Sequence, residues 1–135
     1  MIIKSDRIDV AASKNEIRDF LLNCNHYHLL LPEDKISNFT ATENQCSFKV
    51  QGGITIQLIQ DGIDQDGNVL LKSGANSPFP FSLSAKLNEE GPNTSGEIEF
   101  DGELNSFLAM VATKPLQHLF NFMADRLKHQ FTSKS

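Results

Sequence analysis

The pattern of polar and apolar residues in the first 35 positions predicts a strand followed by two helices. Over residues 4–10 one side of an extended chain carries Lys4, Asp6, Ile8 and Val10 and the other carries Ser5, Arg7 and Asp9, which predicts a strand with one face in water. The period then becomes helical, and Ser13 and Glu16 have the spacing of a capping box at a helix start. We expect one helix over about 14–23 and a second short helix over 25–31, ended by a proline.

From residue 35 to 104 the period is two, broken by turn residues at regular intervals. With no helical stretch in between, this pattern predicts an antiparallel meander of about six strands. The last of these strands carries a row of acidic side chains opposite its apolar ones, and we expect that row to face water. Its members are Glu97, Glu99, Asp101 and Glu103.

A helical period returns at the carboxyl end of the chain, where Asn105 has the character of a helix cap. An apolar stripe runs along the later part of this helix, with members Leu116, Leu119, Phe120, Met123, Leu127 and Phe131. The earlier apolar residues point about a third of a turn away, so we expect a kink or short break near Thr113 to Pro115. Phe122 lies off the stripe, and no sequence pattern explains it.

The strand and helix dimensions predict a space beneath the sheet. Six or seven strands make a sheet about 25–30 Å wide, whereas one helix with its side chains is about 10–12 Å across. Because one helix cannot cover that face, the sheet must curl around it or enclose a cavity. We expect the cavity to be lined by inward apolar side chains, with Phe79 and Phe81 near its entrance. The predicted lining is Phe48, Ile56, Phe79, Phe81, Phe100, Met110, Leu119, Phe120 and Met123.

The order of these elements resembles the START-type helix-grip superfamily (SRPBCC), which includes polyketide cyclases, lipid-transfer domains and pathogenesis-related allergens. The resemblance rests on the first strand, the helix pair ending in Leu30-Leu31-Pro32, the meander, and a final helix containing Lys114-Pro115-Leu116. It covers nearly the whole chain. It implies an α+β fold in which a curved antiparallel sheet of six to seven strands surrounds a long C-terminal helix, with two short helices after the first strand. It also implies a cavity that in many relatives holds a hydrophobic small molecule.

The length, composition and charge of the chain limit the kind of protein it can be and the partners it can bind. A chain of 135 residues with 39% hydrophobic residues is the size of one domain, spanning 1–135. Twelve basic against seventeen acidic residues give a net charge of -5, which repels phosphate backbones, so no nucleic-acid partner is expected. Two cysteines cannot form a disulfide scaffold, and no apolar run approaches the roughly 18 residues of a membrane span. We therefore expect reduced thiols and a cytoplasmic location.

The sequence contains no complete motif for catalysis or for binding a metal or cofactor. Cys24, His26 and His28 could ligate a soft metal, but in a helix His26 would point away from the other two, and no complementary cluster follows. Gly62 to Gly67 has the spacing of a phosphate-binding loop without its lysine and hydroxyl residue, and no dinucleotide fingerprint or nucleophile elbow occurs. The sequence thus predicts no catalytic residue, cofactor or metal.

Three hypotheses about function remain open. The first is binding of a hydrophobic or amphipathic small molecule in the cavity, without catalysis. The second is a protein-interaction module with a filled core that docks another protein through its acidic sheet face or its helix. The third is an enzyme of the cyclase or dehydratase type that uses water held by Asn105 or Tyr27; with His28, these are the polar residues expected near the cavity mouth. A void of about 300 Å³ or more would favour the first or third, and a filled core the second.

Overall fold

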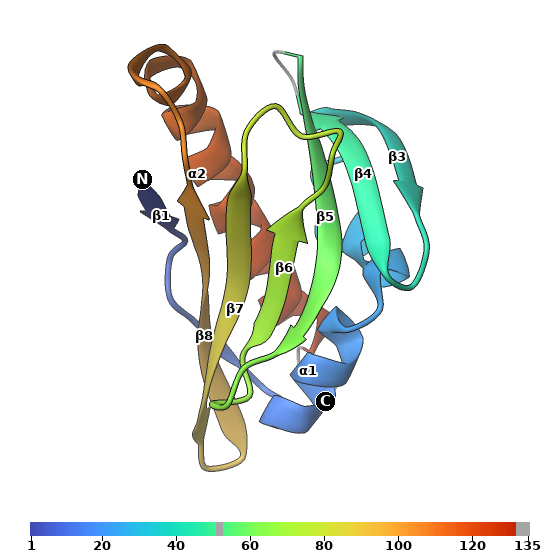
Figure 1. The fold of residues 1–135 in the computed structure, drawn as a ribbon. Coiled ribbons are helices and arrows are strands. Elements are labelled where there is room, and N and C mark those ends of the chain that lie inside the picture. Colours follow the sequence, from blue (N-terminus) through green and yellow to red (C-terminus); the bar gives the residue numbers. More distant parts are fainter. Residues whose placement is uncertain (51–52, 132–135) are drawn as a thin grey trace.

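The computed structural model describes residues 1–50 and 53–131, which form eight strands, two α-helices and one 3-10 helix (Figure 1). The strands are β1 (Ile2–Lys4), β2 (Ile8–Val10), β3 (Ile36–Ala41), β4 (Gln45–Val50), β5 (Ile54–Ile63), β6 (Val69–Ser73), β7 (Phe81–Glu90) and β8 (Asn93–Gly102). The α-helices are α1 (Lys14–Leu21) and α2 (Ser106–Gln130), and the 3-10 helix is η1 (Cys24–Leu29). Neither α-helix of the described chain combines the length and apolar character needed to cross a membrane.

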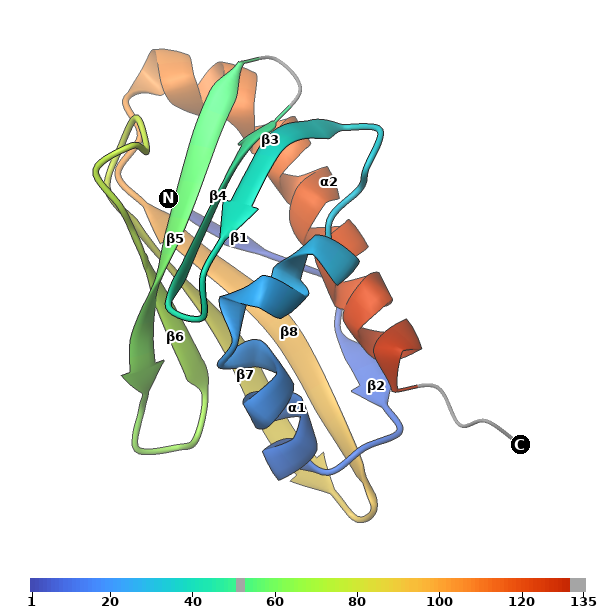
Figure 2. The same cartoon turned by 90° about the vertical axis from the view of Figure 1, so that its right-hand side faces the viewer.

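The strands form one antiparallel sheet in the order β1-β8-β7-β6-β5-β4-β3, with β2 also paired to β8. The six strands from β3 to β8 are joined in sequence, so the predicted meander is confirmed. Figure 2 shows the sheet curling around α2, with α1 and η1 beside it. The predicted α+β helix-grip arrangement is therefore confirmed.

The amino-terminal segment differs from the single alternating strand that the pattern predicts over residues 4–10. It forms two three-residue strands, and Ser5 between them is buried whereas Lys4 is exposed. The Ser5 N–H donates to the Ile98 carbonyl oxygen at 2.8 Å, and the Ile98 N–H donates to Ser5 Oγ at 2.8 Å. This hydroxyl satisfies a buried backbone group, so a polar residue lies inward and the alternation changes phase between β1 and β2.

Helix α2 runs through Pro115 without the short break that the sequence allowed, so a kink is the remaining form of that prediction. Figure 2 shows its first turns inclined to the remainder, as a proline inside a helix favours because it lacks an amide hydrogen and crowds the preceding turn. The expected cap is present, since the Leu108 N–H donates to Asn105 Oδ1 at 2.8 Å.

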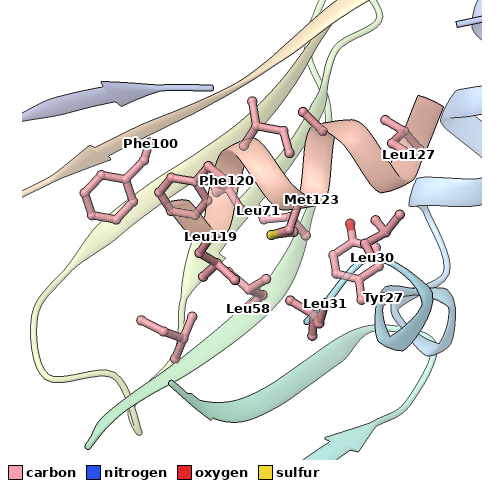
Figure 3. Close-up of a cluster of buried hydrophobic side chains, with 14 of the residues drawn as sticks. Tyr27, Leu30, Leu31, Leu58, Leu71, Phe100, Leu119, Phe120, Met123 and Leu127 are labelled. Carbon is pink, nitrogen blue, oxygen red and sulfur yellow. The ribbon is translucent and has the colours of Figure 1, made fainter. Parts of the chain in front are cut away.

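The core between the sheet and the helices is filled. Phe120 of α2 faces Phe100 of β8, and Met123 lies toward Tyr27 of η1 (Figure 3). The two short helices cover the part of the sheet that α2 does not reach, because Leu21, Tyr27 and other residues of this segment pack on β6 and β7 with only about 20 Å³ left open. The sheet is therefore covered by α1 and η1 as well as by α2, whereas a central cavity was predicted from the width of α2 alone.

Among the described strands, β3 forms one edge of the sheet and has β4 as its single partner. Its register shifts between Ser37 and Thr40, and Asn38 has a φ of 56°, in the left-handed region. Asparagine tolerates this conformation better than most residues, so the sequence accommodates an irregular edge here.

The capping box of α1 is formed as predicted: the Glu16 N–H donates to Ser13 Oγ at 3.2 Å and the Ser13 N–H to Glu16 Oε1 at 3.4 Å. Replacing Ser13 with alanine is expected to lower the free energy of unfolding by about 1 kcal/mol, because one amide at the start of the helix loses its partner. Urea denaturation measures the loss. Ser106→Ala, at an exposed serine that is not a cap, is the control; equal losses in the two variants would contradict the capping role.

Candidate functional site

A groove of about 520 Å³ opens between α2 and the segment that leads from η1 into β3. Figure 2 shows this segment passing beside α2. The groove is lined by Pro32, Asp34, Lys35, Ile36, Val50, Lys114, Pro115, His118, Leu119 and Phe122.

Local sequence explains the shape of this groove. The Lys35 N–H donates to the Pro32 carbonyl oxygen at 3.0 Å, and this turn directs the chain along the helix before β3 begins. On α2, Pro115, Leu119 and Phe122 are spaced by four and three residues, so they lie on one flank of the helix. They form an apolar floor together with apolar residues of the opposite wall.

The rim of the groove is polar and open to water. Asp34, Lys35, Lys114 and His118 are all exposed, and the two α2 residues lie one turn apart on the outward side of the helix. The site therefore has a hydrophobic base and a charged margin, a division that suits a ligand with one apolar and one polar end.

Most of the residues predicted to line a cavity lie in the packed core. Seven of them surround a void of about 10 Å³, which is barely enough for one water molecule. They are Phe48, Ile56, Phe81, Phe100, Leu119, Phe120 and Met123. Leu119 is the one member of the predicted set that also borders the groove.

The other two predicted lining residues lie elsewhere. Phe79 is buried and its ring packs against those of Phe81 and Phe100, with centroids 5.9 and 6.2 Å apart. Met110 is 79% exposed on the first part of α2, because it lies on the opposite side of that helix from the core stripe. Neither residue borders the groove.

Sequence reasoning missed most of the groove. Its lining comes from a loop, a strand end and one flank of a helix, and such a combination has no periodic signal. The one available hint was Phe122, an aromatic residue off the core stripe, which is 38% exposed and borders the groove.

The polar residues considered for catalysis are engaged in structural hydrogen bonds. The Tyr27 hydroxyl donates to the Leu21 carbonyl oxygen at 2.8 Å, and burial raises the pKa of Tyr27 well above its usual value. Asn105 caps α2. His28 is exposed, with Nδ1 2.7 Å from the Asn25 carbonyl oxygen. The three groups thus do not converge on one reacting position.

Cys24 and Cys46 are free thiols buried against each other. The hydrogen bond between their side chains, followed by burial, raises the pKa of Cys46 far above the usual thiol value. His26 stacks on Phe20, with ring centroids 4.6 Å apart. Among residues 1–50 and 53–131, no group of three histidine, cysteine or acidic side chains is arranged to hold a metal ion.

Comparisons with known proteins agree on the architecture. No family model and no curated protein matches the sequence. Solved structures match over almost the whole chain at low identity. A START superfamily protein from Mycobacterium smegmatis has a TM-score of 0.66 at 14% identity, covering 96% of this chain and 98% of that one.

Two plant proteins also match in structure. Norcoclaurine synthase from Thalictrum flavum has a TM-score of 0.72 at 12% identity, covering 99% of this chain and 87% of that one. The major latex-like protein 151 of Panax ginseng has a TM-score of 0.69 at 11% identity, with 98% of each chain covered. At these identities the likeness establishes the fold alone.

Proposed function

Since this chain has the START-type helix-grip fold, we propose that it binds a hydrophobic or amphipathic small molecule in the groove between α2 and the Pro32–Ile36 segment. The observation that carries the proposal is the groove itself. Its volume of about 520 Å³ lies within the range of roughly 300–1,000 Å³ typical of small-molecule sites.

The lining supports selection of the ligand by apolar burial. Ile36, Val50, Leu119 and Phe122 offer hydrocarbon surface, and each methylene that a ligand buries against such surface contributes about 0.8 kcal/mol. The packed core confines the ligand to this edge of the fold. The proposed site is therefore shallower than a cavity enclosed beneath the sheet.

The exposed polar residues at the rim of the groove favour binding without catalysis. General acids and bases with shifted pKa values are typically desolvated and held next to the reacting atoms. Among the described residues that line the groove, the titratable ones are all solvent-exposed.

The interaction-module alternative draws on the filled core and the acidic row of β8. Glu97 and Glu99 of that row are only half-exposed, and the Lys4 ammonium lies 3.8 Å from the Glu99 carboxylate. Lys86 lies opposite Glu97 in the sheet register. Because neighbouring lysines offset part of the row's charge, we place this hypothesis second.

Phe122→Ala tests the groove directly. The variant is expected to bind the neutral fluorescent probe N-phenyl-1-naphthylamine about fivefold more weakly than the natural protein, because it removes about 1 kcal/mol of apolar contact. Fluorescence titration measures the affinity. Phe107→Ala, at a phenylalanine of the same helix that is 68% exposed and outside the groove, should leave it unchanged. Equal weakening in both variants, or no probe binding to the natural protein, would reject the site.

A further inference from the structure

We infer that the groove selects amphiphiles whose polar end is an anion, such as a carboxylate or a phosphate. This inference rests on the proposed function, because it assigns a ligand class to the same groove. It is carried by the distribution of cationic side chains that lack a partner.

Most cations of the described chain already have a partner. Lys4, Arg7 and Lys72 form ion pairs, and Lys14 donates to the Asp66 carbonyl oxygen. Lys86 interacts with the Asp64 carboxylate, and Lys128 is also partnered.

Five described cations have no hydrogen bond or ion pair within residues 1–50 and 53–131; two of them line the groove and two border depressions that adjoin it. Lys35 and Lys114 stand on its rim. Lys49 and Arg126 border two smaller depressions, of about 320 and 340 Å³, that share wall residues with it. Arg18 of α1 is the fifth and borders none of these depressions.

Two acidic residues lie in the same region. Asp34 borders all three depressions and Glu33 borders one of them. Counting histidines as neutral, four positive and two negative charges leave a local excess of +2, although the whole chain carries -5. The groove is thus a cationic region on an anionic protein.

The arrangement of charge and apolar surface assigns each end of the ligand. Lys35 belongs to the Pro32–Ile36 segment and Lys114 to α2, the two elements that form the groove, and the rest of the lining is largely apolar. A headgroup held between the two ammonium groups would place its chain on Leu119 and Phe122. A neutral headgroup would gain no charge interaction there, and a cationic one would be repelled.

The test compares three ligands with the same ten-carbon chain, each used below its micelle concentration: decanoate, decanol and decyltrimethylammonium. Displacement of N-phenyl-1-naphthylamine reports their affinities. Decanoate is expected to bind about three- to tenfold more tightly than decanol, since each exposed ion pair contributes modestly, and the ammonium ligand should bind most weakly. In about 1 M salt, where charges are screened beyond roughly 3 Å, the difference should shrink to less than twofold.

The double variant Lys35→Gln/Lys114→Gln should bring decanoate and decanol within about twofold of each other, chiefly by weakening decanoate binding. Arg18→Gln/Lys72→Gln removes the same total charge away from the groove and should keep the preference. Equal affinities of the natural protein for decanoate and decanol, or an equal loss of preference in both double variants, would overturn the inference and leave the groove standing. Failure of all three ligands to displace the probe would instead reject the proposed function.

Discussion

Replacing Phe120 with alanine is expected to lower the free energy of unfolding by about 3 to 5 kcal/mol. The side chain is 4% exposed, and its ring stacks on Phe100 with centroids 5.5 Å apart and planes at 28°. Truncation removes the apolar contacts of a whole ring and leaves a hole that close-packed neighbours fill only partly. A loss of this size is a large fraction of the stability of an ordinary domain.

Urea denaturation of Phe120→Ala and Phe122→Ala compares two phenylalanines two positions apart on one helix. Phe122 is 38% exposed, and its replacement should cost clearly less than that of Phe120, because more of its surface stays in water and its truncation leaves no closed hole in the core. If Phe120→Ala does not fold, Phe120→Leu retains most of the volume and should still be clearly destabilised. A small loss at Phe120 combined with altered probe binding would instead indicate a ligand cavity beneath the sheet.

Above pH 10 the phenol of Tyr27 is expected to ionise only as the protein unfolds. The side chain is 1% exposed; burial, followed by the charges of Cys24 and Cys46 when ionised, raises its pKa well above the usual value. A folded-state pKa above the unfolded one gives stability that is complete below about pH 10 and is lost as the pH rises further. Since Tyr27 is the one tyrosine and the chain has no tryptophan, absorbance at 295 nm reports this group alone.

The measurement is a pair of alkaline titrations, one by absorbance at 295 nm and one by far-ultraviolet circular dichroism. The two transitions should coincide in the native protein, whereas urea-unfolded protein should titrate near pH 10. Tyr27→Phe removes the absorbance change, but part of the alkaline instability should persist because the pKa of Cys46 is raised as well. Phenol ionisation near pH 10 with native dichroism would refute the burial argument.

The order of the elements could be predicted from the sequence because each element has a local pattern of its own. These patterns are the capping box before α1, the alternation from β3 to β8, and the apolar stripe of α2. The prediction failed at Ser5, where a long-range hydrogen bond to Ile98 places a polar residue inside. Local pattern carries no information about such a partner 93 positions away.

The central cavity was predicted from the widths of the sheet and of one helix, and the structure shows two features that these widths do not contain. Tyr27 and the helices around it cover the part of the sheet left open by α2. The aromatic rings of Phe81, Phe100 and Phe120 then fill the space under α2. How the side chains interlock depends on rotamers and on the curl of the sheet, neither of which can be read from spacing.

The irregular conformation of β3 bears on how the molecule behaves at high concentration. An edge strand with a straight row of free amides and carbonyls invites the same strand of a neighbouring molecule, which leads toward fibrils. At Asn38 the left-handed turn of the backbone interrupts that row after the first residues of the strand. The edge of the sheet is thereby less able to pair with the same edge of another molecule. This protection comes from the conformation of the main chain and needs no added charge.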